Sequence, residues 1–358
     1  MKILKQVLGV DVDRQNLVVT LGRLTDDLSA EFYAHKVFPN NRNGFSSLLK
    51  WVRSHTAPSV QFRAVMEATG VYHQKFAYFL DERGIALSIV LPNKISSYMR
   101  TLDIKTVTDK SASRAICRFG LERKLDDWKR PEGVYKKLQQ LTRERDQIIG
   151  ERTMAKNQLH AETSEAEPHK GTVKRLKARI ELFDKHISEI EEELEGYSKK
   201  DKQLDARVSR ITTIPGGGKM TAMVVLAETN GFELIRNKKQ LVSYAGLDVK
   251  EKLSGTSVRG KPRISKKGNR HLRKAMYFPA IAAARYNPDH KGLYERIVDR
   301  SGIKKKGLVA VQRKVLELIY VLDKNGTVFD PEYENSASVK KTAHAIQADS
   351  KAALIEQI

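Results

Sequence analysis

The sequence is poor in cysteine and has no long apolar run. A single cysteine, Cys117, excludes an internal disulfide and any cysteine-rich zinc site. The longest apolar runs, such as Leu87–Leu91 and Met223–Leu226, are far shorter than the ~20 residues that span a bilayer. An aspartate stands where a signal peptide would carry its apolar segment, so we expect no secretion signal, no membrane association and a cytoplasmic location.

Acidic residues are also scarce relative to basic ones. The 358 residues include 65 Lys and Arg against 43 Asp and Glu, so the formal charge is +22. With 40% hydrophobic residues the chain is too apolar to be wholly disordered, and its length predicts two or three domains. An excess of this size indicates a nucleic-acid partner, because basic surface binds phosphate by releasing counterions. The alternative is a generally basic soluble protein.

The N-terminal region, residues 1–128, has the pattern of an α/β domain. Apolar runs at Gln6–Val12, Leu17–Arg23 and Glu31–Phe38 are joined by short polar links, which is typical of antiparallel hairpins. Helical and strand patterns then alternate. The predicted order β-β-β-α-β-α-β-α is typical of a ribonuclease-H-like fold. Its later elements are expected at Asn43–Ser54, Phe62–Met66, Tyr72–Glu82, Leu87–Leu91 and Asp109–Gly120.

The middle region, residues 129–205, is dominated by charged residues and spaced apolar ones. Its second half carries a heptad seam, and Arg145 and Arg152 occupy two seam positions of the first half. Pro168 and Gly171 break the pattern, so we expect an antiparallel helical hairpin or coiled coil that serves as a spacer or an oligomerisation arm. The seam of the second half consists of Val173, Leu176, Ile180, Phe183, Ile187, Ile190 and Leu194.

The third region, residues 206–330, is expected to be a mainly helical domain, and residues 331–358 a polar, poorly ordered tail with a short helix near Ala343–Ile355. The predicted helices of the domain are Lys219–Glu228, Lys239–Ala245, His271–Tyr286 and Leu308–Leu322.

Three acidic residues lie at the ends of predicted elements. Asp11 ends the first strand, Glu67 ends the fourth, and Asp109 begins the helix after the last strand. The first and fourth strands are neighbours in a ribonuclease-H-like sheet, which would bring two carboxylates together. Hard oxygen ligands close together are typical of Mg²⁺ sites that act on phosphodiesters. Taken singly, each residue also fits a turn or a helix cap.

A glycine turn precedes one of the C-terminal helices. Gly216, Gly218 and Lys219 belong to a pattern that resembles a helix-hairpin-helix turn, whose backbone N–H groups can hold a phosphate. The spacing does not fit a Walker loop. A plain turn between helices is the alternative.

The segment 250–274 holds ten Lys or Arg and one acid, Glu251, and therefore carries a charge of +9. Ser254 and Ser257 lie within it, and Gly255 directly follows Ser254. A serine among cations could attack phosphorus, since those charges stabilise the alkoxide and the oxyanion, or it could only bind phosphate. The residues expected to contact nucleic acid are Arg259, Lys261, Arg263, Lys266, Lys267, Asn269, Arg270, Arg273 and Lys274.

Together these motifs resemble the DEDD transposases of insertion sequences that act as bridge-RNA-guided recombinases, over about residues 5 to 290. The resemblance implies a Holliday-junction-resolvase-like domain, a coiled coil and a C-terminal domain with a catalytic serine. It implies that Asp11, Glu67 and Asp109 are three acids of the metal-binding tetrad and that Ser254 is the nucleophile, with Ser257 as a second candidate. The matching motifs are Gly9-Val10-Asp11, Glu67-Ala68-Thr69-Gly70, Thr108-Asp109-Lys110-Ser111, Ile214-Pro215-Gly216, Ala245-Gly246-Leu247, Ser254-Gly255-Thr256-Ser257 and Ile264-Ser265-Lys266-Lys267-Gly268-Asn269.

One position departs from the family pattern. The fourth acid is expected three residues after Asp109, one helical turn on, and that position is Ala112. Alanine has no metal ligand, so we expect binding and assembly with little or no strand cleavage. Either the acid has been replaced in this chain or the natural protein lacks it. Asp13 and Asp103 are imperfect substitutes by position.

The resemblance implies an RNA-guided DNA recombinase that cuts and rejoins strands through a phosphoserine intermediate with Mg²⁺. Its implied partners are double-stranded target and donor DNA, a structured non-coding guide RNA, and further copies of the chain in a dimer or dimer of dimers. It also implies a bacterial or archaeal, nucleoid-associated protein. The alternatives are a metal-dependent junction resolvase or nuclease that uses water, and a non-catalytic RNA- or DNA-binding scaffold.

Overall fold

The computed structural model describes residues 2–68, 70–102, 104, 106–233, 235–251, 253–254, 258–260 and 263–331, with the backbone alone at 253–254 and 258–259. The chain divides into two compact units between Arg130 and Pro131, and each is described by itself. Ser257, Lys261, Asp103 and the predicted tail after 331 lie outside the described residues.

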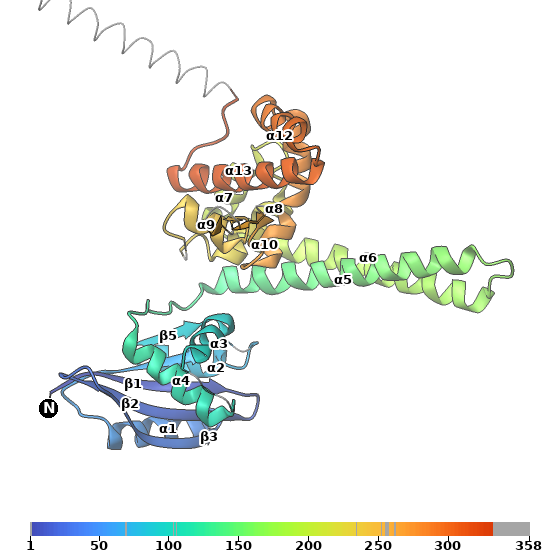
Figure 1. Cartoon of the computed structure of the whole chain (residues 1–358). Helices are drawn as coiled ribbons and strands as arrows, with labels where there is room; N and C mark the ends of the chain where they lie inside the picture. The colour runs from blue at the N-terminus through green and yellow to red at the C-terminus, as the bar shows by residue number, and fades with distance from the viewer. Residues whose placement is uncertain are drawn as a thin grey trace, which may run out of the picture. The chain divides into compact units, whose positions relative to one another are not determined.

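The first unit is built on one five-stranded sheet (Figure 1). The strand order is β3-β2-β1-β4-β5, with β1–β3 antiparallel and β4 and β5 parallel to β1. The predicted ribonuclease-H-like order, including the neighbouring first and fourth strands, is confirmed for this unit. The strands are β1 (Ile3–Val12), β2 (Asn16–Thr25), β3 (Ala30–Pro39), β4 (Phe62–Glu67) and β5 (Leu87–Val90).

Two helices cover each face of this sheet. Leu8 and Val10 of β1 pack in the core beneath α1 (Arg42–His55) and α2 (Gln74–Asp81). Val7 points to the other face, as alternation along a strand requires, and packs in the core beneath α3 (Pro92–Arg100) and α4 (Asp109–Glu122). The helix α3 is absent from the sequence-based expectations, because only three buried residues mark it: Ile95, Tyr98 and Met99.

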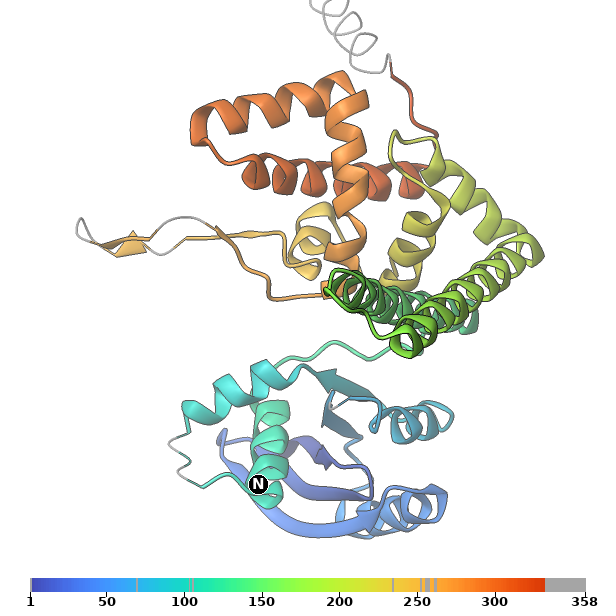
Figure 2. The ribbon, with the colours of Figure 1, turned by 90° about the vertical axis from the view of Figure 1, so that its right-hand side faces the viewer.

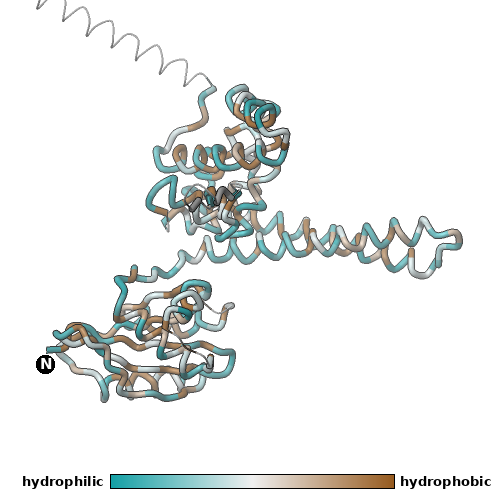
Figure 3. The backbone as a smooth tube through the Cα atoms, viewed as in Figure 1, coloured by the Kyte–Doolittle hydropathy of each residue, from teal (hydrophilic) through white to brown (hydrophobic). Residues whose placement is uncertain are grey.

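The second unit begins with two helices of 31 residues, α5 (Gly133–Thr163) and α6 (Lys170–Lys200), which lie side by side (Figure 1). The helix breaks between them, where Pro168 predicts it. The arginines of the seam pair across the hairpin: Arg145 lies 2.6 Å from Glu191, and Arg152 contacts Asp184. Figure 3 shows apolar residues recurring along both helices between polar ones. The coiled-coil assignment stays a prediction.

The remaining helices of the second unit form a core that includes the base of the long hairpin. Leu138 of α5 and Leu194 of α6 are buried in the same cluster as Leu226 and Val311. The expected helix His271–Tyr286 is wrong as a single helix, since it is interrupted at Met276. The helices are α7 (Lys202–Thr212), α8 (Lys219–Thr229), α9 (Lys238–Tyr244), α10 (Arg270–Ala275), α11 (Tyr277–Tyr286), α12 (Pro288–Ser301) and α13 (Lys304–Asn325).

The described parts of the segment 249–264 form a narrow β-hairpin arm that projects from these helices (Figure 2). Its base pairs β6 (Val249–Lys250) with β9 (Arg263–Ile264), and its outer part pairs β7 (Leu253–Ser254) with β8 (Val258–Arg259). The sequence pattern does not predict these strands of two residues. Within the described part of the chain, every helix is too short or too polar to span a membrane.

Candidate functional site

The carboxyl ends of β1 and β4 place two acids beside each other. The strands pair in parallel up to Val10 and Met66, and Asp11 and Glu67 are the next residue on each strand. Since paired residues of parallel strands point to the same face, both side chains lie on the face that α4 covers. Both residues are half-buried.

Two glycines let α4 approach this face closely. A Cβ atom at Gly9 would lie 2.3 Å from the backbone nitrogen of Cys117 and 2.4 Å from the carbonyl oxygen of Ser113. At Gly120 a Cβ would lie 2.8 Å from Val7 and Val65. Therefore α4 runs antiparallel to β1, and its N-terminal turn lies at the end of the sheet that carries Asp11.

The first turn of α4 is fixed by a capping box. Thr108 accepts a hydrogen bond from the backbone N–H of Ser111 at 3.2 Å, and the Ser111 hydroxyl accepts one from the backbone N–H of Thr108 at 2.8 Å. Asp109 is the first helical residue and is exposed. The cap thus holds the third acid at the rim of the site.

The negative charges of Asp109 and Glu67 both act on the carboxyl group of Asp11. Burial, followed by the negative charges of Asp109 and of Glu67, raises the pKa of Asp11 from 3.8 to about 6, against a lowering by the backbone N–H of Val12. The structure therefore places Asp11 and Glu67 at the ends of neighbouring strands, with Asp109 near enough for its charge to act on Asp11, and their role as a metal-binding group stays a prediction.

The three carboxylates fit a hard divalent cation by their chemistry. Like charges around a half-buried Asp11 are unfavourable, a cation would relieve this, and an all-oxygen ligand set suits Mg²⁺. In the described residues, no group of three or more His, Cys, Asp or Glu side chains is arranged to hold a metal. Binding a cation would thus require the carboxylates to approach one another more closely. Ala112, one turn after Asp109, is half-buried and supplies no ligand.

Ser254 lies on the hairpin arm of the second unit. Its backbone pairs with Val258, and that of Leu253 with Arg259. The base of the arm is fixed by tertiary contacts: the Ser265 hydroxyl donates to Asp248 at 2.5 Å, and the backbone N–H of Lys266 donates to the carbonyl of Gly246 at 3.1 Å. These contacts fix the place where the arm leaves the helical core, and the role of Ser254 as nucleophile stays a prediction.

Several residues predicted to contact nucleic acid have intramolecular roles. Lys219 pairs with Glu195 at 3.2 Å, Arg273 donates to the carbonyl of Ala245 at 2.7 Å, and Lys274 pairs with Asp146. Gly216 (φ +88°) and Gly218 are both exposed, but a Cβ at Gly216 would clash with Pro279 and Ala282 of α11, whereas one at Gly218 would meet nothing within 4 Å. The side chains of Arg263, Lys266, Lys267 and Arg270 are exposed and available to a ligand.

A buried acid that the sequence analysis overlooks holds the base of the arm. The side chain of Glu228, in α8, is fully buried and accepts hydrogen bonds from Arg143 of α5 at 2.7 and 2.8 Å. It also accepts one from Asn269 at 2.6 Å, and Asn269 in turn caps α10. These bonds lower the pKa of Glu228 despite its burial. A lone acid in an apolar helix is the signal that could have found it.

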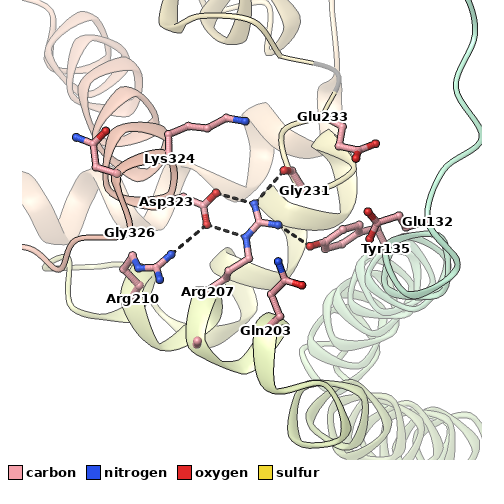
Figure 4. A pocket seen from close by; sticks show the side chains of 12 residues that line it. Glu132, Tyr135, Gln203, Arg207, Arg210, Gly231, Glu233, Asp323, Lys324 and Gly326 are labelled. Carbon is pink, nitrogen blue, oxygen red and sulfur yellow. Dashed lines mark hydrogen bonds and ion pairs between the residues drawn. The ribbon is translucent and has the colours of Figure 1, made fainter.

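A hollow of about 530 Å³ lies near the start of α5 (Figure 4). The side chain of Arg207 lines this hollow and donates hydrogen bonds to both carboxylate oxygens of Asp323, at 2.8 and 2.6 Å. The same guanidinium donates to the hydroxyl of Tyr135 at 2.6 Å and to the carbonyl of Gly231 at 2.9 Å. With its donors engaged, Arg207 ties α5, α7 and α13 together and is a structural clamp.

Two family models match the chain. The model DEDD_Tnp_IS110, described as "Transposase", matches residues 8–166, and the model of the "Transposase IS116/IS110/IS902 family" matches residues 208–295. The first covers all three acids and the second covers the hairpin arm.

Full-length relatives are similar at moderate identity. The chain is 27% identical to a pilin gene-inverting protein of Moraxella bovis, over 91% of this chain and 98% of the relative. It is 29% identical to the pilin gene-inverting protein of Moraxella lacunata, over 82% and 89%. Among solved structures, RuvC of Thermus thermophilus in complex with a Holliday junction substrate matches with a TM-score of 0.27 and 9% identity, over 34% of this chain and 99% of that one.

Proposed function

Because the chain belongs to the IS110/IS116 family of DEDD transposases, we propose that it exchanges DNA strands through a covalent phosphoserine intermediate. The observation that carries the proposal is the electrostatic group of Asp11, Glu67 and Asp109 at the carboxyl ends of neighbouring strands. These acids would hold divalent cations, Mg²⁺ by preference, which supply positive charge at the scissile phosphate.

The serine arm supplies the nucleophile in this proposal. The Ser254 hydroxyl attacks phosphorus, the Oγ–P bond forms as the bond to the 3′-oxygen breaks, and the serine proton ends on that 3′-oxygen. Attack of this 3′-hydroxyl on the phosphoserine of a partner strand then joins the strands and restores the serine. Exposed cations of the same segment, among them Arg263, Lys267 and Arg270, favour this role because they attract the DNA backbone.

The acids and the serine belong to different units, so a site could be completed by two copies of the chain. We infer a dimer or dimer of dimers, with the long hairpin of α5 and α6 setting the pairing. A structured guide RNA would select target and donor by base pairing, while the protein contacts mostly backbone. RNA that co-purifies with the chain tests this: one discrete species supports guidance, and random fragments contradict it.

The residue at position 112 limits the activity. With Ala112 in place of the fourth acid, the chain binds and assembles but cleaves little or not at all. Covalent adducts formed by the unmodified chain at the rate of an Ala112→Asp variant would show that this position carries no fourth acid.

Peptide mapping of the covalent adduct tests the nucleophile. An Ala112→Asp variant is incubated with Mg²⁺ and labelled duplex, digested with protease, and the peptide that carries a nucleotide is identified by mass spectrometry. We expect Ser254 on that peptide and no adduct after Ser254→Ala, while Ser257→Ala retains it. Nicked DNA without any adduct would instead identify a water-using nuclease, and intact DNA with no adduct would favour a binding scaffold.

A further inference from the structure

A second hollow in the helical unit takes no part in the proposed chemistry. It has a volume of about 340 Å³ and lies between α5, α8, α10 and α11. Ile149, Met220, Val224 and Ala275 give it apolar walls. The volume falls at the lower end of the ~300–1,000 Å³ range of small-ligand sites, so it suits a single ring system rather than a protein segment.

Phe278 lines this hollow and is 75% exposed. The ring of Tyr277, itself 42% exposed, lies edge-on to it with centroids 5.5 Å apart. The next residues, Pro279 and Ala280, are buried, so α11 is anchored while its first aromatic side chains face solvent. An exposed phenyl ring beside an apolar hollow offers a surface on which a flat ring can stack.

Ionisable side chains complete the wall. Arg143 bonds Glu228, Lys274 pairs with Asp146, and Arg145 and His271 also line the hollow. An apolar partner would cover these groups without offering them hydrogen bonds, which is unfavourable. A flat aromatic ligand with hydrogen-bond donors and acceptors along its edge would match both the apolar and the ionisable side chains that line the hollow.

We propose that this hollow receives an unpaired nucleobase of a bound DNA strand, stacked on Phe278. The side chains of Lys267 and of Arg270, the first residue of α10, are exposed and would attract the phosphates of the bound strand. The inference rests on the proposed function, because strand exchange separates bases that were paired. It adds a base-binding role to a unit whose other expected contacts are with the backbone.

A bulged duplex tests this in the unmodified chain, where cleavage does not interfere. Two duplexes share one sequence, and one of them carries a single extra 2-aminopurine. We expect the bulged duplex to bind more tightly and its fluorescence to be quenched, because stacking quenches 2-aminopurine. Phe278→Ala should remove the quenching and weaken binding of the bulged duplex by about 5- to 100-fold, the contribution of one base–aromatic stack. Binding of the paired duplex should not change.

Tyr286→Ala is the matched control, since Tyr286 is a 69% exposed aromatic of the same helix that does not line the hollow. Equal effects of the two variants, or no preference for the bulge, overturn the inference. The inference is also overturned if 2-aminopurine is quenched in a bulged RNA but not in the bulged DNA. A change of molar mass on light scattering after Phe278→Ala would overturn it too, because the ring would then be a contact between copies of the chain. Failure of the unmodified chain to bind even the paired duplex would instead contradict the proposed function.

Discussion

Asp11 and Glu67 each directly follow a residue of the last parallel pair between β1 and β4, and the charge of Glu67 helps to raise the pKa of Asp11. The pairing of the two strands, rather than a flexible loop, sets the position of both acids. Asp109 reaches the same region from a helix that two glycines hold against the sheet. This arrangement leads to testable consequences for stability, pH dependence and DNA binding.

The pKa of Asp11 makes stability depend on pH. In the folded chain it is raised from 3.8 to about 6, so ionised Asp11 destabilises the fold. The penalty is absent below pH 3.8, grows as the pH rises to 6, and is complete above 6. Without divalent cations, Asp11→Asn should therefore stabilise the protein at pH 7.5, by the order of 1 kcal/mol after allowance for solvent screening, and have no effect at pH 3.5. Urea unfolding at the two pH values measures this.

The control for that experiment is Asp26→Asn, at an exposed acid of the turn between β2 and β3. It should change stability little at either pH. If Asp11→Asn behaves in the same way, the carboxylate of Asp11 does not experience the repulsion described here.

The glycine of β1 is required for the position of α4. We expect Gly9→Ala to lower the free energy of unfolding by about 1–3 kcal/mol, because its Cβ would overlap the backbone of α4. Gly150→Ala, in α5 where a Cβ meets nothing within 4 Å, should raise it by about 1 kcal/mol through helix propensity. Chemical denaturation compares them. If Gly9→Ala does not lower the free energy of unfolding, α4 does not pack closely against Gly9.

The clamp around Arg207 should dominate the stability of the second unit. Asp323→Ala leaves the 15% exposed Arg207 side chain without its carboxylate, and we expect a loss of about 3–5 kcal/mol. Arg152→Ala breaks a more exposed pair on the long hairpin and should cost about 0–1 kcal/mol. Denaturation curves followed by circular dichroism separate the two. Similar losses would mean that burial of the pair has no energetic consequence.

The exposed cations between the arm and α10 should contribute to DNA affinity through phosphate contacts. Lys267→Ala should weaken binding of any duplex sequence alike and reduce the slope of log K against log salt by about 1. Lys185→Ala, at a 71% exposed lysine of α6, serves as a control of equal charge. Fluorescence anisotropy over a salt series measures the slopes, and identical slopes for both variants would place the DNA elsewhere.

Much of the first unit follows from the sequence. Apolar runs and short polar links predict its sheet, and Asp11 and Glu67 can be placed at strand ends from the chain alone. The close approach of α4 cannot, because Gly9 and Gly120 meet residues that are far away in the sequence. Only the folded chain shows that these glycines bring the start of α4 to the sheet edge.

The second unit is less predictable, for physical reasons that particular residues illustrate. Arg145 looks misplaced in an apolar seam until its partner Glu191 is seen across the hairpin. The strands of the arm have two residues each, which is too short for an alternating apolar pattern to be recognised in the sequence. Glu228 gains its role from Arg143 and Asn269, which come from segments distant in sequence.

The most direct test of the account is the dependence of covalent adduct formation on Asp11. The Ala112→Asp chain, with Asp11 intact or changed to Asn, is mixed with labelled duplex and either Mg²⁺ or a chelator, and protein-linked DNA is quantified on a denaturing gel. We predict adducts only when both Asp11 and Mg²⁺ are present. Equal yields from the Asp11→Asn chain would contradict the assignment of the acids at the ends of β1 and β4 as the metal-binding centre.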